Sequence, residues 1–238
     1  MKLKGWGGYP VHEASVKSPF EITEIIELVK KGNLIARGNG RSYGDSSINI
    51  ANTLSMKNFN KIIFFDDNTG ELVAEAGILL EDVIKTFLPK GWFPFVTPGS
   101  KFVTLGGMFA ADVHGKNHHK EGNFCKYVNW IEIINKDGDV KKCSRTENSE
   151  LFYWSIGGMG LTGIIIKISI RLRKIETSWI KQKILVANNL DEAIDIFEKN
   201  MQYTYSVAWI DCCAKKTGNG RSLVYLGEHA KLKDLNQK

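Results

Sequence analysis

The amino-acid sequence predicts an α+β fold, in which a larger domain over residues 1–174 precedes the start of a second domain over residues 175–238. Short apolar runs typical of strands are interspersed with stretches whose apolar residues recur at helical spacing. The chain has 238 residues and is 43% hydrophobic, which is enough to bury one large core or two smaller ones. Its charged fraction of 24% is ordinary and excludes the disordered and fibrous classes.

The first hundred residues predict both helices and strands. A capping box at Ser18–Glu21, with proline at the first helical position, predicts a helix that continues to Gly32. Pro89 predicts the end of a second helix, because proline lacks the amide hydrogen that a helix interior requires. The other expected elements are strands at Leu34–Arg37, Lys61–Phe65 and Glu71–Ala76, and the second helix itself at Leu79–Leu88.

The rest of the chain is richer in strands. In Ile164–Arg173 a continuous apolar run changes to alternation, as expected for a strand that leaves a core for the surface, and we place the domain boundary near Lys174. The tail from Gly227 to Lys238 shows no evident terminal element, which favours the front part of a longer protein. The other expected elements are a hairpin of Trp130–Ile134 and Val140–Cys143, helices at Glu150–Ser155 and Leu190–Lys199, and strands at Ile180–Val186 and Ser206–Asp211.

The run Val103–His119 concentrates more candidate chemistry than any other part of the sequence. Its glycine pair at 106–107 lets the backbone approach a ligand closely and offers unobstructed amide donors. The alanine pair at 110–111 keeps this wall thin, and histidine and lysine side chains follow it. The run therefore predicts a wall for a large ligand, with cationic groups at its end.

Two other glycine-rich segments need separate interpretations. Ala36–Asp45 follows a predicted strand and contains Arg37 and Arg41, so a structural turn and a pyrophosphate cradle explain it equally well. Gly158–Gly163 matches the dinucleotide-binding pattern GxGxxG, but that mechanism needs a preceding strand and a following helix. Here a predicted helix precedes and a strand follows, which favours a tight helix-to-strand corner.

Several function classes are disfavoured. The net charge of +6 arises from 32 basic and 26 acidic residues that are interleaved, so we expect no nucleic-acid partner. His114 and His118 would share a helical face, but Gly115 and the lack of nearby carboxylate or cysteine ligands argue against a metal site, and we expect none. For His114, a hydrogen-bonded structural role and an active-site role stay equally open.

The expected location is the cytoplasm. The four cysteines form no CxxC pair, and a disulfide framework is not indicated. We expect neither a transmembrane segment nor an export signal, because no apolar stretch has the required length. Peripheral attachment to the inner face of a membrane stays open.

Taken together, these motifs resemble the vanillyl-alcohol-oxidase superfamily of flavoproteins, which have a PCMH-type FAD-binding domain of two subdomains. Within it, they are most similar to the branch that oxidises decaprenylphosphoryl-β-D-ribose. The run from His114 to His119 is specific within the superfamily, whereas the glycine loops are shared more widely. The segments that carry the resemblance are Trp6–Gly7, Ala36–Asp45, Pro98–Gly99, Val103–Gly107, Asp112–His119, Gly160–Ile165, Tyr203–Trp209 and Gly220–Ser222.

The resemblance implies FAD as the cofactor and an antiparallel substrate-binding sheet after the FAD-binding domain. Tyr43, Gly44 and Asp45 stand where covalently flavinylated relatives carry a histidine, so we expect non-covalent FAD. His114, Lys116 and Tyr43 are the implied catalytic residues. The implied cofactor-binding residues are Ala36, Arg37, Gly38, Asn39, Gly40, Arg41, Ser42, Tyr43, Gly44, Asp45, Ser46, Gly99, Thr104, Leu105, Gly106, Gly107, Ala111, Asp112, Val113, His114 and Ile165.

The implied activity is oxidation of a secondary hydroxyl of a polyprenyl-phosphate-linked pentose, with hydride passing to flavin N5, in the synthesis of cell-wall arabinan precursors or a related glycolipid. The expected partner is a short-chain reductase that uses a nicotinamide cofactor. A sugar-lactone or alditol oxidase, a non-catalytic FAD- or lipid-phosphate-binding module and, more remotely, a histidine metal hydrolase are the alternatives. Relatives complete the catalytic face with a later lysine and tyrosine, and this sequence ends before them.

Overall fold

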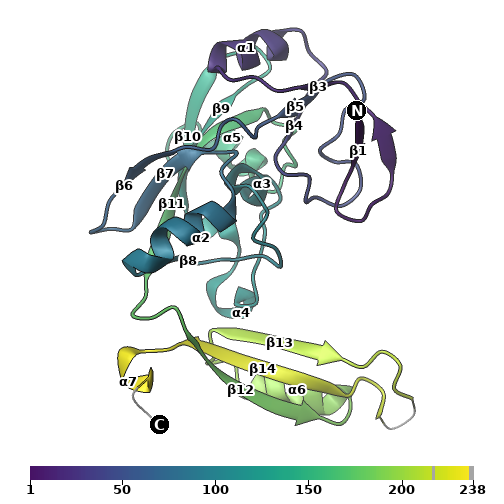
Figure 1. The fold of residues 1–238 in the computed structure, drawn as a ribbon, viewed down its shortest axis with the longest axis vertical. Helices are drawn as coiled ribbons and strands as arrows, with labels where there is room; N and C mark the ends of the chain where they lie inside the picture. Colours follow the sequence, from purple (N-terminus) through teal and green to yellow (C-terminus); the bar gives the residue numbers. More distant parts are fainter. Residues whose placement is uncertain (216–217, 236–238) are drawn as a thin grey trace.

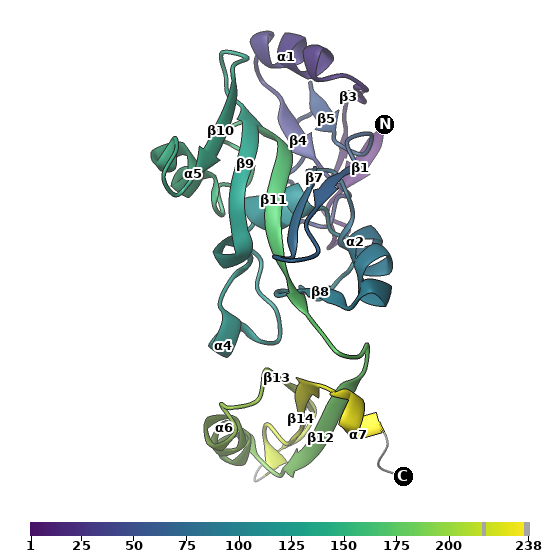
Figure 2. The same cartoon turned by 90° about the vertical axis from the view of Figure 1, so that its left-hand side faces the viewer.

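The protein, described here from a computed structural model of residues 1–215 and 218–235, has α+β architecture. Two β-sheet regions of different size are joined by a single crossing of the chain after Lys174 (Figures 1 and 2). The larger region carries most of the helices. The smaller one lies at the carboxyl-terminal end of the described chain.

The amino-terminal part contains short strands and one helix. Strands β1 (Lys2–Lys4) and β2 (Val11–Glu13) form an antiparallel pair. Strands β3 (Val16–Lys17), β5 (Thr53–Ser55) and β4 (Ile35–Arg37) form a parallel sheet in that order, beside α1 (Ile22–Lys30). Ile25 of α1 and Leu54 of β5 pack with Ile164 of the next sheet, so this subdomain shares a core with it.

The large sheet is antiparallel and built around one long strand. Its order is β10 (Val140–Ser144), β9 (Val128–Ile134), β11 (Ile164–Lys174), β7 (Glu71–Glu75) and β6 (Ile62–Phe65), and β8 (Trp92–Pro94) pairs with the end of β11. Its main core contains residues from three helices, α2 (Leu80–Phe87), α3 (Leu105–Ala110) and α5 (Ser149–Ser155). Short helical turns at Leu88–Lys90, His118–Glu121 (α4) and Phe124–Tyr127 complete this region.

The third sheet has the order β12 (Ile180–Ala187), β14 (Ser222–His229) and β13 (Tyr205–Ile210), and both pairings are antiparallel. Helix α6 (Leu190–Lys199) packs on one face of this sheet. Helix α7 (Leu232–Leu235) follows the last strand. In Figure 2, α6 lies to one side of the sheet.

Most of the elements predicted from sequence are confirmed, but two predictions are wrong. The first helix begins at Ile22 and not at the predicted capping box, because the Asn58 side chain donates to the carbonyls of Ser18 (3.3 Å) and Pro19 (2.9 Å) and holds them in a non-helical segment. The sequence shows no evident terminal element from residue 227 on, yet residues 227–229 belong to β14 and α7 follows; the part of this prediction that concerns residues 236–238 lies outside the described residues. The Gly158–Gly163 corner does join a helix, α5, to a strand, β11.

Candidate cofactor and substrate site

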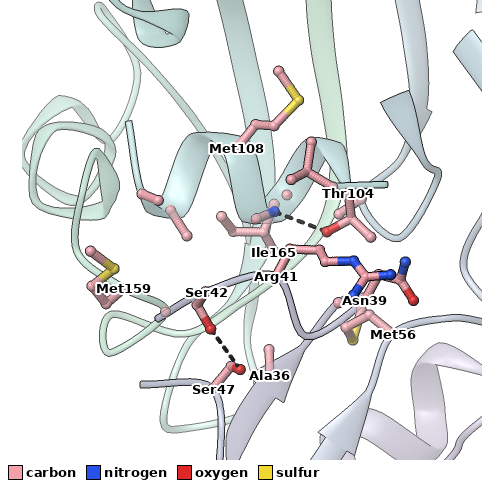
Figure 3. Close-up of a pocket in the computed structure, with 18 of the residues that line it drawn as sticks. Ala36, Asn39, Arg41, Ser42, Ser47, Met56, Thr104, Met108, Met159 and Ile165 are labelled. Carbon is pink, nitrogen blue, oxygen red and sulfur yellow. Dashed lines mark hydrogen bonds between the residues drawn. The ribbon is translucent and has the colours of Figure 1, made fainter. Parts of the chain in front are cut away.

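A cavity lies where three glycine-rich segments meet, between the amino-terminal subdomain and the large sheet (Figure 3). About 890 Å³ of space there is not filled by protein atoms, part of it open to solvent. The lining residues, called the cradle below, are Ala36, Gly38, Asn39, Gly40, Arg41, Ser42, Ser46, Ser47, Met56, Ala76, Val103, Thr104, Gly106, Gly107, Met108, Ala110, Ala111, Val113, Met159, Gly160, Gly163 and Ile165.

The first wall of the cradle is the loop after β4. Within the described residues, none of the amide N–H groups of residues 39–46 donates a hydrogen bond to the protein. The loop keeps its shape through side chains instead: the Arg37 guanidinium donates to Ser47 Oγ (3.0 Å) and to the Lys4 carbonyl (2.7 Å), and Ser42 Oγ lies 3.0 Å from Ser47 Oγ. A row of free amide donors around a bend is the geometry that binds phosphate oxygens.

Arg37 supports this loop from within. A Cβ atom on Gly40 would overlap the Arg37 guanidinium, and Gly40 also has a positive φ of 65°. Burial lowers the pKa of Arg37 below its usual value. Arg37 does not line the cavity, so its contacts make it a support of the loop, whereas Arg41 does line it.

Arg41 is held at the cavity by two aromatic rings from other segments. Its guanidinium carbon lies 5.1 Å from the centre of the Trp6 ring and 5.7 Å from that of Phe102. Asn39 Nδ2 donates to the Phe102 carbonyl (2.9 Å), and the Trp6 amide donates to the Ser42 carbonyl (2.8 Å), so both aromatic residues are tied to the same loop. The cation is thereby fixed beside the free amides.

The second wall is the start of α3. Thr104 caps this helix, since its Oγ1 accepts a hydrogen bond from the Gly107 amide (3.2 Å), and the Gly106 amide donates to the Ala76 carbonyl (2.8 Å). A Cβ atom at Gly38 would overlap Thr104 Oγ1, and one at Gly106 would meet Ala76 Cβ at 2.9 Å. The glycines are therefore required both for packing and for open space at the wall.

The third wall is the corner before β11. Gly160 and Gly163 have positive φ angles of 80° and 147°, and a Cβ atom on Gly163 would overlap the Ile134 carbonyl oxygen. Ile165 follows on β11 and faces the cavity from the sheet (Figure 3). The sequence favoured a structural corner here, and the structure adds that the corner presents backbone to the cavity.

Thirteen of the residues assigned to the cofactor lie in the cradle, and eight do not. Leu105 is fully buried in the core, Asp112 accepts hydrogen bonds from Asn123 Nδ2 (2.8 Å) and the Cys125 amide (3.1 Å), and Tyr43 is 75% exposed. The others outside the lining are Arg37, Gly44, Asp45, Gly99 and His114. Nine further residues line the cradle. Val103, Met108 and Ala110 belong to the predicted ligand wall, and Met159, Gly160 and Gly163 belong to the predicted corner. Sequence reasoning missed Ser47, Met56 and Ala76, and the two apolar ones carry no signal that distinguishes them from core residues.

A second cavity lies beyond Val113, between the large sheet region and the third sheet. Among the described residues that line it, Lys116 is the one lysine or arginine. Its other lining residues are Phe93, Thr97, Ile180, Gln182, Tyr205, Ser206, Val207, Tyr225, Leu226 and Gly227. Val113 lines the first cavity and Lys116 the second, so the segment from 113 to 116 passes from one to the other.

The histidine-rich run is divided between different roles. His114 is exposed and its ring lies 5.4 Å from that of His118, centre to centre, while a His119 ring nitrogen lies 2.9 Å from the Tyr203 carbonyl. Asn117 is fully buried and donates to the Phe95 carbonyl (2.7 Å). Within residues 1–215 and 218–235 we find no group of three or more His, Cys, Asp or Glu side chains placed to hold a metal ion.

The run also holds the third sheet against the larger region. The Ser206 amide of β13 donates to the Lys116 carbonyl (2.9 Å), and Lys120 Nζ donates to the Gln202 carbonyl (2.8 Å). Nearby, the Tyr205 hydroxyl and His229 Nε2 lie 3.0 Å apart. Burial raises the pKa of Tyr205 and lowers the pKa of His229, so both side chains are favoured in their neutral forms.

Together, the cradle and its fold define a dinucleotide-binding domain of the flavoprotein type. The FAD-binding domain family model matches residues 11–144, and the chain belongs to this family, with FAD as its cofactor and the PCMH-type fold. The residues present fit FAD: free amides and Arg41 suit its diphosphate, and Ala110, Val113 and Ile165 offer an apolar surface to a flat ring.

Curated proteins with related sequences include sugar and lactone oxidases. The chain is 36% identical, over its whole length, to decaprenylphosphoryl-β-D-ribose oxidase of Mycolicibacterium smegmatis, and it covers 54% of that protein. It is 25% identical, over 71% of its length, to D-arabinono-1,4-lactone oxidase of Kluyveromyces lactis and, over 79%, to L-gulonolactone oxidase of Mus musculus, covering 34% and 44% of those proteins. The chain thus spans about half or less of these relatives.

Proposed function

We propose that this chain is the cofactor-binding part, with the start of the substrate-binding part, of an enzyme that oxidises a secondary hydroxyl of a polyprenyl-phosphate-linked pentose. The observation that carries the proposal is the segment 113–116, which lines the FAD cradle at Val113 and a separate cavity at Lys116. A ligand in the second cavity would meet the cofactor at this segment. The whole-length similarity to decaprenylphosphoryl-β-D-ribose oxidase supports the choice of substrate.

The residues of the chain divide the work of binding. When bound, FAD supplies the acceptor for a hydride. The loop 38–46 would hold its diphosphate, and the Arg41 side chain of this loop would assist. The rest of the cofactor would face Thr104–Gly107, Ala111, Val113 and Ile165. We propose residues 1–174 as the cofactor-binding unit and 175–238 as the start of the substrate-binding unit.

Lys116 and His114 are our proposed catalytic residues. Lys116 would bind a sugar or phosphate oxygen in the second cavity, and His114 is a candidate base for the hydroxyl proton. Tyr43 lines neither cavity, so no contact in the structure brings it to Lys116; it stays a proposal from the resemblance alone. The main contribution expected of side chains that bind the substrate is to hold the sugar carbon within reacting distance of the cofactor.

The test is anaerobic single-turnover reduction of the flavin by a polyprenylphosphoryl pentose. The loss of flavin absorbance measures the rate of this reduction. We expect His114→Gln to slow the reduction by roughly 10²–10⁴-fold, the usual size of a general acid–base contribution. Lys116→Met should weaken substrate binding and slow the reduction at low substrate concentration. Lys126→Met is the matched control, since it replaces an exposed lysine outside the two cavities. Rates equal to the control rates would remove both residues from the mechanism.

A sugar-lactone or alditol oxidase is the second candidate, because two lactone oxidases share 25% identity with the chain. Release of peroxide on addition of a lactone or alditol would favour it. A protein that binds FAD but is never reduced by any sugar would instead be a binding module.

The expected partners are also proposals. We propose a short-chain reductase with a nicotinamide cofactor as the enzyme that uses the oxidised product, and a cytoplasmic location at a membrane face that holds the lipid substrate. No helix in the described part of the chain is both long enough and apolar enough to cross a membrane.

A further inference from the structure

The third sheet has two apolar faces, and α6 covers one of them. Ala187, Val224 and Ala208 pack with residues of α6. Because successive side chains of a strand point to opposite faces, the alternate residues form the other face. Strand register brings these residues together across three strands, and we call them the open face: Ile184, Val186, Val207, Trp209, Leu223 and Tyr225.

The far end of the open face is strongly exposed. Trp209 is 74% exposed, Val186 67% and Ile184 53%. They lie side by side, since Ile184 pairs through Tyr225 with Val207, and Val186 pairs through Leu223 with Trp209. A contiguous apolar surface of this kind marks an interaction site more often than scattered apolar residues do.

The open face continues into the second cavity. Its residues Val207 and Tyr225 line that cavity together with Lys116. One end of the surface therefore carries a cation, and the other end is apolar at Ile184 and Val186. Val186 lies four positions along β12 from Gln182 at the cavity, about 13 Å of strand. Across the three strands the width is about 10 Å.

These dimensions decide between occupants. A stable protein interface buries about 800 Å² on each partner, far more than a strip of this size offers. An anionic head group on an apolar chain matches both the cation at one end and the apolar strip that leads away from it. We infer that the open face binds the prenyl chain of the substrate, with its phosphate beside Lys116. This inference rests on the proposed function, which supplies the identity of the head group.

The inference can be tested without turnover, by calorimetric titration of the intact protein with isopentenyl phosphate and farnesyl phosphate below their micelle concentrations. We expect farnesyl phosphate to bind at least tenfold more tightly. Ile184→Gln should weaken farnesyl phosphate at least fivefold and leave isopentenyl phosphate unchanged. The matched control is Ile194→Gln on α6, which makes the same substitution at a site 46% exposed and outside the open face, and it should change neither value by more than twofold.

Equal affinities for the short and long phosphates would overturn the inference. So would an Ile184→Gln effect no larger than that of Ile194→Gln, or a dimer that Ile184→Gln converts to monomers, which would assign the face to a second copy. Because neither ligand carries a sugar, the two proposals fail separately: chain-length-dependent binding without flavin reduction by the pentose would sustain this inference and remove the proposed function.

Discussion

Replacing Gly38 by alanine tests whether close packing between two glycine-rich segments shapes the cofactor cradle. The added methyl carbon would overlap Thr104 Oγ1 and would lie 3.0 Å from Thr104 Cγ2 and 3.2 Å from Thr104 Cβ. Thr104 is buried and caps α3, so it cannot move away freely. Such overpacking costs about 1–3 kcal/mol.

The expected result is a fall in melting temperature of roughly 2–12 °C for a chain of this size, measured by thermal denaturation of the FAD-free protein. FAD affinity, measured by quenching of flavin fluorescence, should fall as well, because Gly38 and Thr104 both line the cavity. Gly99→Ala is the control. No atom lies within 4 Å of a Cβ at Gly99, so its stability should change by less than about 0.5 kcal/mol.

A double-mutant cycle identifies the cause. Thr104→Ala alone should cost about 1 kcal/mol through loss of the helix cap. In the double variant the two nearest obstructing atoms, Thr104 Oγ1 and Cγ2, are gone, so the total loss should be smaller than the sum of the two single losses. Additivity to within about 0.5 kcal/mol, or a Gly38→Ala protein as stable as Gly99→Ala, would refute the packing argument.

Four further outcomes are expected. Arg37→Met removes hydrogen bonds to Ser47 and to the Lys4 carbonyl, so it should cost about 1–3 kcal/mol in denaturant titrations and weaken FAD binding; an unchanged midpoint would contradict this. Asn117→Leu leaves the buried Phe95 carbonyl without its donor and should cost a similar amount, about 1–3 kcal/mol, by the same titration. Burial lowers the pKa of His229 from 6.5, so the contribution of this residue to stability is complete above pH 6.5 and is lost as the pH falls towards the lowered pKa. His229→Gln should therefore flatten the dependence of the unfolding free energy on pH in that window. An unaltered slope would contradict this prediction. Acid precipitation should leave the flavin in the supernatant, whereas yellow colour in the pellet would show a covalent link.

Local patterns in the sequence predicted the elements that depend on near neighbours. The helix Leu190–Lys199 has the predicted bounds, and Asn189 caps it by accepting a hydrogen bond from the Glu192 amide (2.9 Å). The alternation in residues 164–173 likewise predicted β11, because a strand that leaves a core must change its pattern.

Elements that depend on distant partners were not predicted. Strand β14 is the middle strand of its sheet, between β12 and β13. It forms because the tertiary structure brings these two strands to its edges. Helix α3 contains two adjacent glycines, which disfavour a helix by about 1 kcal/mol each. It forms because the Gly106 amide reaches the Ala76 carbonyl and Thr104 caps its first turn.

By itself, the sequence determined that free backbone amides, thin walls and cationic side chains occur in particular loops, because glycine, alanine, lysine and arginine have these properties in any setting. Only the tertiary structure decided which loops meet. It turned Arg37 and Asp112 inward as supports, left Tyr43 exposed and assigned Val113 and Lys116 to different cavities. The physical reason is that side-chain direction follows from strand register and long-range packing, which short sequence patterns do not contain.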